Sequence, residues 1–214
     1  MHPRATVGRT TRRFGVVTLL VWAAAARGGE PEHLREATRQ AIEICHAADR
    51  VPVAEREALL AIGIKRAEEA VKTDPDDAAA HFAVFCNIGK GLMHRSGWRL
   101  LSVLGDLGRA RKEIDLALAL APDFPGALAA KGELLTELPG FLGGDRQEGE
   151  RLLRRAVDLE PDDPRMRLML ANVLQTAGQR DEARAHAAIA VGILERAGTA
   201  NDLATARTLV ASLQ

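Results

Sequence analysis

PRMRLMLANVLQTAGQRDEARAHAAIAV, residues 164–191, is the most regular segment of this chain. Its small and apolar residues fall on two helical faces, because they recur at steps of three and four positions. The residues that define these faces are Leu170, Ala171, Ala183, Ala187 and Ala190. Gly178 lies between the two faces, where a tight turn is needed. The segment therefore predicts two antiparallel helices joined by one short turn.

Three earlier segments share one ending. They read AVKTDPD at 70–76, ALALAPD at 117–123 and AVDLEPD at 156–162, each with an alanine five residues before a proline. The alanine lets a helix approach its neighbours closely, and the proline prevents that helix from continuing. The acidic residues that follow favour the start of the next helix. We interpret each ending as the boundary between two helical hairpins.

The boundaries divide the chain into about four hairpins, at 31–77, 78–124, 125–163 and 164–197. Pro75 and Pro122 are 47 residues apart and Pro122 and Pro161 are 39 apart, so the second and third hairpins both carry insertions. The residues at 201–213 form one more apolar face, which we expect to cover the open end of the stack. The sequence predicts a single all-α domain over 27–214, built as a solenoid.

Composition agrees with helices and argues against nucleic-acid binding. The chain is 47% hydrophobic but only 3% aromatic, without tyrosine, and its many Ala and Leu residues favour helix over sheet. Four of the 29 basic residues and none of the 29 acidic residues lie in the first 26 positions. The remaining chain has a formal charge of −4. We expect no nucleic-acid partner, because such partners require a positive face.

Residues 1–26 have the three-part plan of a secretory signal peptide. A basic segment comes first, an apolar segment covers 14–22, and four alanines end at Ala26. We predict cleavage after Ala26 and a secreted or periplasmic product without a stable membrane span, since the apolar segment is shorter than about 20 residues. An uncleaved anchor or a misassigned start remains the alternative. Sec export and twin-arginine export both fit Arg12 and Arg13.

Two cysteines, Cys45 and Cys86, lie in the predicted first helices of neighbouring hairpins. An oxidising compartment would permit a disulfide between them, provided that their Cα atoms come within about 7 Å. The alternative is a pair of separate buried thiols that pack as small apolar residues.

Two segments depart from the regular pattern. For 89–108, GKGLMHRSGWRLLSVLGDLG, we predict an extension of the preceding helix past Gly91, a turn near Ser96 and Gly97, and a short helix with Trp98, Leu101 and Leu104. This segment either forms an apolar contact surface or fills the solenoid core.

The second departure is the lengthened turn at 138–144. Asp145 and Glu148 follow it at the spacing of a capping box, in which each side chain accepts a hydrogen bond from the backbone N–H of the other residue. Because the Asp145 carboxylate would occupy the start of the next helix, we expect no phosphate site there.

The pattern at 164–191 resembles the tetratricopeptide repeat (TPR), and the three alanine-to-proline endings extend the resemblance from about Pro31 to Gln214. Exported bacterial TPR-like proteins, including the T-component of TRAP transporters and the microtubule-dynamics regulator family, are distantly similar. The resemblance implies an all-α, right-handed solenoid that binds proteins or a ligand, and it implies no catalytic residues. His81, Leu128 and Arg167 depart from the tryptophan usual at their position.

No recognisable catalytic motif or cofactor site is present in the sequence. The motifs of α/β-hydrolases, zinc proteases and P-loop proteins are all absent. Cys45, His46, His81 and Cys86 are the only group that could supply soft metal ligands, and they lack the spacing of a zinc site. We therefore expect no enzymatic activity, no metal and no cofactor.

A solenoid of this kind would bind in the concave groove formed by its first helices. The candidate groove residues are Phe82, Lys90, Ala129, Glu133, Glu137, Arg165, Leu168, Asn172 and Gln175. Their mixed charges and amides suit an extended peptide. The leading hypothesis is a non-catalytic scaffold of the bacterial cell envelope that binds a protein or peptide. The alternative is an accessory component of a transporter, in which 89–108 helps to enclose a small molecule.

Overall fold

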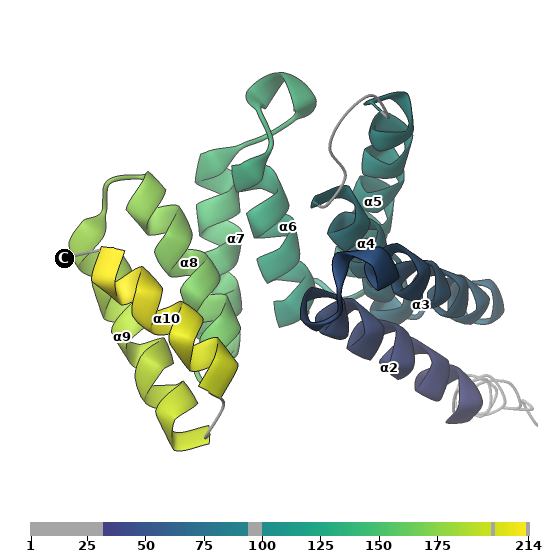
Figure 1. Cartoon of the computed structure of the whole chain (residues 1–214). Coiled ribbons are helices and arrows are strands. Elements are labelled where there is room, and N and C mark those ends of the chain that lie inside the picture. Colours follow the sequence, from purple (N-terminus) through teal and green to yellow (C-terminus); the bar gives the residue numbers. More distant parts are fainter. Residues whose placement is uncertain (1–31, 94–99, 198–199, 213–214) are drawn as a thin grey trace, which may run out of the picture.

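The computed structural model describes residues 32–93, 100–197 and 200–212 (Figure 1). Across these ranges the chain forms nine α-helices and two short 3₁₀-helices, and it contains no strand. The helices pack as successive antiparallel hairpins, from α2 and α3 at one side to α9 and α10 at the other (Figure 1). The all-α solenoid is therefore confirmed. The predicted signal peptide lies outside the described residues and stays a prediction.

The first hairpin consists of α2 (Glu32–Ala47), the 3₁₀-helix η1 (Ala48–Arg50) and α3 (Val53–Thr73). The buried residues of α3 are Leu60, Gly63, Ala67 and Ala70. Ile62 is 50% exposed, whereas Gly63 lies on the inner face, where its missing side chain leaves room for α2 and α4 to pack closely.

The second hairpin consists of α4 (Ala78–Met93) and α5 (Leu100–Leu120). The extension of α4 past Gly91 is confirmed. The prediction of a separate short helix with Leu101 and Leu104 is wrong. Both residues belong to α5, which runs without a break through the second half of the predicted insertion. The i, i+3, i+4 apolar pattern continues through Leu104 and Leu107 to Ala110, so one long helix satisfies it. Ser96, Gly97 and Trp98 lie outside the described residues.

A disulfide and a buried side-chain hydrogen bond join α2 to α4. Cys45 and Cys86 form a disulfide with their Cα atoms 5.9 Å apart, so the alternative of two separate thiols is wrong. The side chain of Asn87 is fully buried, and its Nδ2 donates to the carbonyls of Ala41 at 2.9 Å and Ala83 at 2.8 Å. These links hold the first two hairpins together.

The third hairpin consists of α6 (Pro125–Glu137), the 3₁₀-helix η2 (Gly140–Leu142) and α7 (Arg146–Leu159). Its two helices approach closely at a pair of glycines. A Cβ atom at Gly132 would lie 2.8 Å from the carbonyl oxygen of Gly149, so neither helix tolerates a side chain at this crossing.

Only half of the predicted capping box forms. The Asp145 carboxylate accepts from the backbone N–H of Glu148 at 3.0 Å. The return bond is absent, because the backbone N–H of Asp145 donates to the carbonyl of Leu135 at 2.9 Å and the Glu148 carboxylate binds Arg151 instead. Because the turn at 138–144 folds back onto α6, the backbone N–H of Asp145 binds the carbonyl of Leu135 and is not available to the Glu148 side chain.

The fourth hairpin consists of α8 (Pro164–Thr176) and α9 (Arg180–Ala197), and α10 (Ala200–Ser212) follows it. Gly178 has φ +79° and forms the predicted turn. All five residues that defined the two helical faces are buried: Leu170, Ala171, Ala183, Ala187 and Ala190. The α10 helix packs on α9, and its Leu209 and Val210 contact the core, as expected of a terminal cap.

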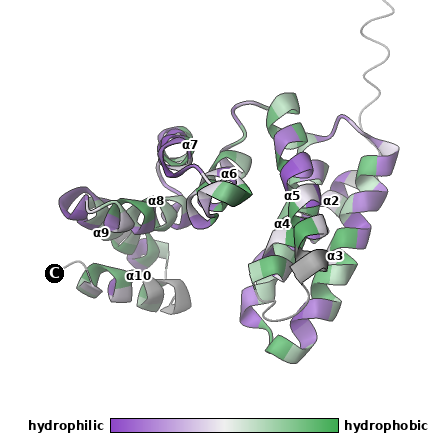
Figure 2. Cartoon of the chain, turned by 90° about the horizontal axis from the view of Figure 1, so that it is seen from above, coloured by the Kyte–Doolittle hydropathy of each residue, from purple (hydrophilic) through white to green (hydrophobic). Residues whose placement is uncertain are grey.

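The stack is least closely packed between its second and third hairpins. The α2 helix packs on α4 and α6 packs on α8, whereas the second and third hairpins meet mainly through α5 and α6. Seen from above, α2 to α5 form one group of helices and α6 to α10 another (Figure 2). The apolar core of the first group extends onto α6 through Ala127, the second group has a separate core cluster, and Leu118 packs against both clusters.

Candidate binding site between the second and third hairpins

A largely apolar cavity of about 330 Å³ opens between the second and third hairpins. The C-terminal part of α4, the N-terminal half of α5, α6 and the turn that follows α6 form its walls. The apolar residues that line it include Phe85, Leu92, Leu107, Ala130, Leu134, Leu138 and Leu142. Cys86, one half of the disulfide, also contacts the cavity. Its volume falls within the range of about 300–1,000 Å³ typical of ligand pockets.

Aromatic packing closes the base of this junction. The ring of Phe82 lies 5.0 Å from the ring of Phe124, which immediately precedes α6, and 6.5 Å from that of Phe85. Phe82 is only 6% exposed, so its predicted role in an open groove is wrong. The bulky rings pack the two hairpins together at the start of α6, and the helices diverge beyond them to leave the cavity.

Exposed apolar side chains surround the cavity. Met93 at the end of α4 is 65% exposed and Leu104 on α5 is 43% exposed, and both contact the cavity. We call Met93 and Leu104 the apolar rim. Phe141 of η2, next to the lining residue Leu142 in sequence, is 88% exposed. Apolar residues that gather around an opening commonly mark a contact surface.

Three predicted groove residues meet at the same cavity. Lys90 on α4 lies across from Glu133 and Glu137 on α6, and all three contact the cavity. Lys90 forms an ion pair with Asp49 of η1. Neither glutamate carboxylate has a hydrogen-bond or ion-pair partner among the described residues.

The electrostatic environment of Glu133 reflects this arrangement. Burial raises the pKa of the Glu133 carboxyl above its ordinary value; Lys90 opposes this shift, and the nearby carboxylates of Glu137 and Asp49 add to it. Removing a carboxylate from water disfavours its charged form unless a cation compensates. Among the described residues, Lys90 is the cation that opposes the shift, and burial outweighs it, so the cavity has an acidic side on α6.

Arg111 of α5 holds the turn that forms one wall of the cavity. Its guanidinium donates to the carbonyl of Leu142, and it lies directly against Gly143, whose φ is +78°. A side chain at Gly143 would collide with the guanidinium and would strain the backbone. The turn is thus fixed against α5 as well as α6.

The predicted groove residues of the fourth hairpin lie away from the cavity. Asn172 and Arg165 are exposed, while Leu168 is half-buried. The Nε2 of Gln175 donates to the Oγ of Ser212 at 3.1 Å, so α10 covers that end of the surface. The structure therefore does not bring all the predicted residues into one open groove.

Arg165 instead connects the first and last hairpins. Its Nη1 lies 3.4 Å from both ring nitrogens of His46 near the end of α2, and its Nη2 lies 3.0 Å from the Asp163 carboxylate. Burial, followed by the charges of Arg165 and Lys90, lowers the pKa of His46. The inner side of the solenoid is narrow enough at this point for opposite hairpins to touch.

A second histidine contacts an arginine within the fourth hairpin. His186 on α9 lies 3.3 Å from Arg167 on α8, through Nδ1 and Nη1. Burial and then the charge of Arg167 lower the pKa of His186.

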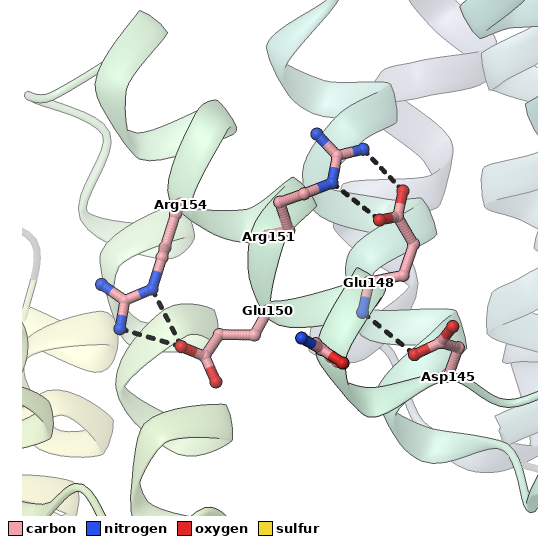
Figure 3. A pocket seen from close by; sticks show the side chains of 6 residues that line it. Asp145, Glu148, Glu150, Arg151 and Arg154 are labelled. Atoms are coloured by element: carbon pink, nitrogen blue, oxygen red, sulfur yellow. Dashed lines mark hydrogen bonds and ion pairs between the residues drawn. The ribbon is translucent and has the colours of Figure 1, made fainter.

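The charged surface of α7 is neutralised by its own side chains. Figure 3 shows Arg151 paired with Glu148 at 2.6 Å and Arg154 paired with Glu150 at 2.9 Å, each within one turn of the helix. Arg154 also reaches Glu182 on α9 at 2.9 Å. Since these charges have partners, we assign this surface a structural role.

No three metal-binding side chains come together in the ranges that the structure describes. His81, which the sequence placed near a candidate metal cluster, lies 2.6 Å from the Glu113 carboxylate and 2.9 Å from the carbonyl of Pro75. Both ring nitrogens are thereby engaged in joining α4 to α5 and to the preceding turn. None of the described helices is long and apolar enough to cross a membrane.

Sequence reasoning found the two segments that build the cavity but missed the cavity itself. The signal for both segments was their departure from the repeat pattern at 89–108 and 138–144. Met93, Leu142 and Phe141 were not candidates, because periodicity does not reveal that two hairpins diverge.

The comparisons with known proteins agree with this fold. The family model described as tetratricopeptide repeat matches residues 141–213. The structure of TTC0263, a thermophilic TPR protein in Thermus thermophilus, is similar with a TM-score of 0.59 and 23% identity, over 92% of this chain and 87% of that one. MamA has a TM-score of 0.47 and 13% identity, over 76% of this chain and 95% of its own. No curated protein sequence matches the chain.

The family match covers residues 141–213 of the chain, and the similarity to TTC0263 shows the fold alone. The similarity to the T-component of TRAP transporters and to the microtubule-dynamics regulator family stays a prediction.

Proposed function

We propose that this protein is a non-catalytic scaffold that binds a peptide segment of another protein. The observation that carries the proposal is the cavity between α4, α5 and α6, with its apolar rim and the convergence of Lys90, Glu133 and Glu137. A preformed apolar site next to a few polar groups is the usual form of a binding site. The TPR fold supports a peptide as the ligand.

A peptide library displayed on phage tests this function. We expect the purified, disulfide-bonded chain to enrich a family of related peptides that a reference protein such as serum albumin does not retain. Failure to enrich any such family would count against peptide binding. The double variant Arg165→Glu/Asn172→Ala then maps the surface. If it retains the enriched peptides more weakly than the native chain does, the site extends onto α8. If retention is unchanged, the site is confined to the cavity.

We further propose that the scaffold works in the bacterial cell envelope. The basic, apolar and alanine-rich parts of 1–26 support export. The Cys45–Cys86 disulfide supports an oxidising compartment, since structural disulfides are rare in the cytosol. Fractionation of the source cells, with N-terminal sequencing of the purified protein, tests this point. Recovery from the cytosol with residues 1–26 intact would contradict it.

Ligand binding for a transporter is the second candidate, and the volume of the cavity favours it. A small apolar or anionic molecule could occupy about 330 Å³ without any partner protein. Trp98 is the only tryptophan beyond residue 26, so its fluorescence provides a specific readout. A shift in emission on titration with octanoate, dodecanoate or an amino acid would favour this candidate. Unchanged emission with every compound would disfavour it.

A further inference from the structure

The size of the cavity suits one large side chain of a partner. An apolar protein cavity of roughly 150 Å³ is large enough to bind benzene, and this cavity measures about 330 Å³. A Phe, Trp, Leu or Met side chain would therefore fit with part of its backbone at the opening. The apolar rim of Met93 and Leu104 provides further contacts for the residues that flank such an anchor.

The charges beside the cavity select the flanking residues of the partner. Lys90 is already paired with Asp49, whereas the carboxylates of Glu133 and Glu137 have no partner among the described residues. A partner that brings a cation would compensate both glutamates, and one that brings an acid would be repelled. Burial raises the pKa of Glu133 and Lys90 opposes the shift without cancelling it, so a further cation at this surface would favour the charged carboxylate.

We infer that the cavity binds a peptide with a bulky apolar side chain and a Lys or Arg two residues away, whose cation contacts Glu133 and Glu137. Residues two apart in an extended peptide project from the same side, so both side chains can reach this surface together. The inference rests on the proposed peptide-binding function and specifies the chemistry of the partner.

Two glycines of α4 provide a matched pair of variants. Gly89 contacts the cavity, and a Cβ there would meet only the ring of Phe85, at 3.9 Å. Gly91 lies on the same helix outside this cavity, and a Cβ there would meet nothing within 4 Å. Gly89→Leu should fill the cavity, whereas Gly91→Leu should leave it open. Both changes favour helix formation, so both variants should remain folded.

The test uses the phage-selected peptides and their synthetic copies. We expect an enriched apolar-x-Lys/Arg pattern, and we expect Gly89→Leu to weaken binding of those peptides by roughly 10- to 100-fold, the equivalent of losing one buried side chain. Gly91→Leu should bind as the native chain does. Changing the apolar residue of the peptide to Ala should have the same effect as Gly89→Leu.

The charge requirement is tested separately. Glu133→Gln/Glu137→Gln should weaken binding of the Lys-containing peptide by roughly tenfold, in line with a charge-assisted hydrogen bond. When norleucine replaces Lys in that peptide, the double variant and the native chain should bind it with equal affinity. Glu69→Gln, on the exposed side of α3, is the control. Binding to the native chain should also weaken as acidification protonates Glu133, whose pKa burial raises.

The outcomes distinguish this inference from the proposed function. Enriched peptides that lack the cation, or that bind Gly89→Leu as tightly as Gly91→Leu, would overturn the inference while leaving peptide binding intact. Absence of any enriched peptide would count against both. A dimer that forms with rising concentration and that Gly89→Leu abolishes would make a second copy of this chain the occupant, which also overturns the inference.

Discussion

Asp163 combines two roles at the start of α8. Its carboxylate accepts from the backbone N–H groups of Arg165 at 2.7 Å and Met166 at 3.2 Å, and it also binds the Arg165 guanidinium. Burial opposes ionisation of Asp163, but these contacts outweigh it and lower the pKa of the carboxyl. One side chain thus fixes both the helix start and the arginine that reaches His46.

Asp163→Ala should lower the free energy of unfolding by about 1 kcal/mol, because the first turn of α8 loses its cap. Urea unfolding followed by circular dichroism measures the change. Asp162→Ala is the control, since Asp162 is exposed and caps no helix. Equal effects of the two substitutions would show that the cap does not stabilise the hairpin.

The close approach of Gly63 to the side chain of Asn87 leads to a second prediction at the scale of single residues. A Cβ at Gly63 would lie 2.1 Å from the Oδ1 of Asn87, which is fully buried and cannot move without breaking its bonds to Ala41 and Ala83. Gly63→Ala should therefore destabilise the protein by about 1–3 kcal/mol through overpacking. Thermal unfolding tests this.

Gly105→Ala is the matched control for Gly63→Ala. Gly105 lies within α5 and a Cβ there would meet nothing within 4 Å. The substitution should stabilise the protein by up to about 1 kcal/mol, because alanine favours helix. If both alanine variants were stabilised, the close packing of α3 against α4 would be contradicted.

At the scale of elements, the disulfide between α2 and α4 spans 41 residues. Closing a loop of this length stabilises a protein by about 4 kcal/mol in the chain-entropy description. Reduction should therefore lower the unfolding temperature by about 8–16 °C for a protein of this size. Thermal scans with and without a phosphine reductant measure it. The double variant Cys45→Ala/Cys86→Ala should not respond to the reductant.

Helical elements could be predicted from the sequence where one local rule governs them. The α8 and α9 helices follow apolar periodicity, and Gly178 supplies their turn, so the residues that defined their inner faces were all correctly anticipated. The capping box at α7 was only half correct, because a distant carbonyl on α6 competes for the backbone N–H of Asp145.

The candidate site could be predicted only in part. Lys90, Glu133 and Glu137 were expected in one groove from their repeat positions, and the structure does bring them to one cavity. The cavity also depends on how the second and third hairpins pack against each other, where Phe82 contacts Phe124. Local patterns contain no information about such contacts between hairpins.

At the scale of the whole molecule, His46 and Arg165 are 119 residues apart in sequence, and their contact joins the first hairpin to the fourth. Both His46 and His186 have lowered pKa values in the folded state. As pH falls below about 6.5, the unfolded chain binds protons on these groups before the folded chain does. Acidification from pH 7.5 to 5 should therefore reduce the free energy of unfolding, as urea titrations at both pH values would show.

The double variant His46→Gln/His186→Gln isolates this effect. Glu133 acts in the opposite direction, because its raised pKa lets the folded chain bind a proton first. The variant should therefore lose less stability than the native chain between pH 7.5 and pH 5. If the variant lost as much stability on acidification as the native chain, the pH dependence would arise from groups other than His46 and His186.

The covalent link between α2 and α4 also determines how the molecule responds to force. Solenoids can yield one repeat at a time when they are pulled from their ends. The 41 residues between Cys45 and Cys86 cannot extend while the link is intact, which withholds about 140 Å of contour length. A chain stretched in an optical trap should gain that length only after reduction. The disulfide thus makes α3, together with the adjoining ends of α2 and α4, a segment that cannot be extended while the rest of the stack unfolds and refolds.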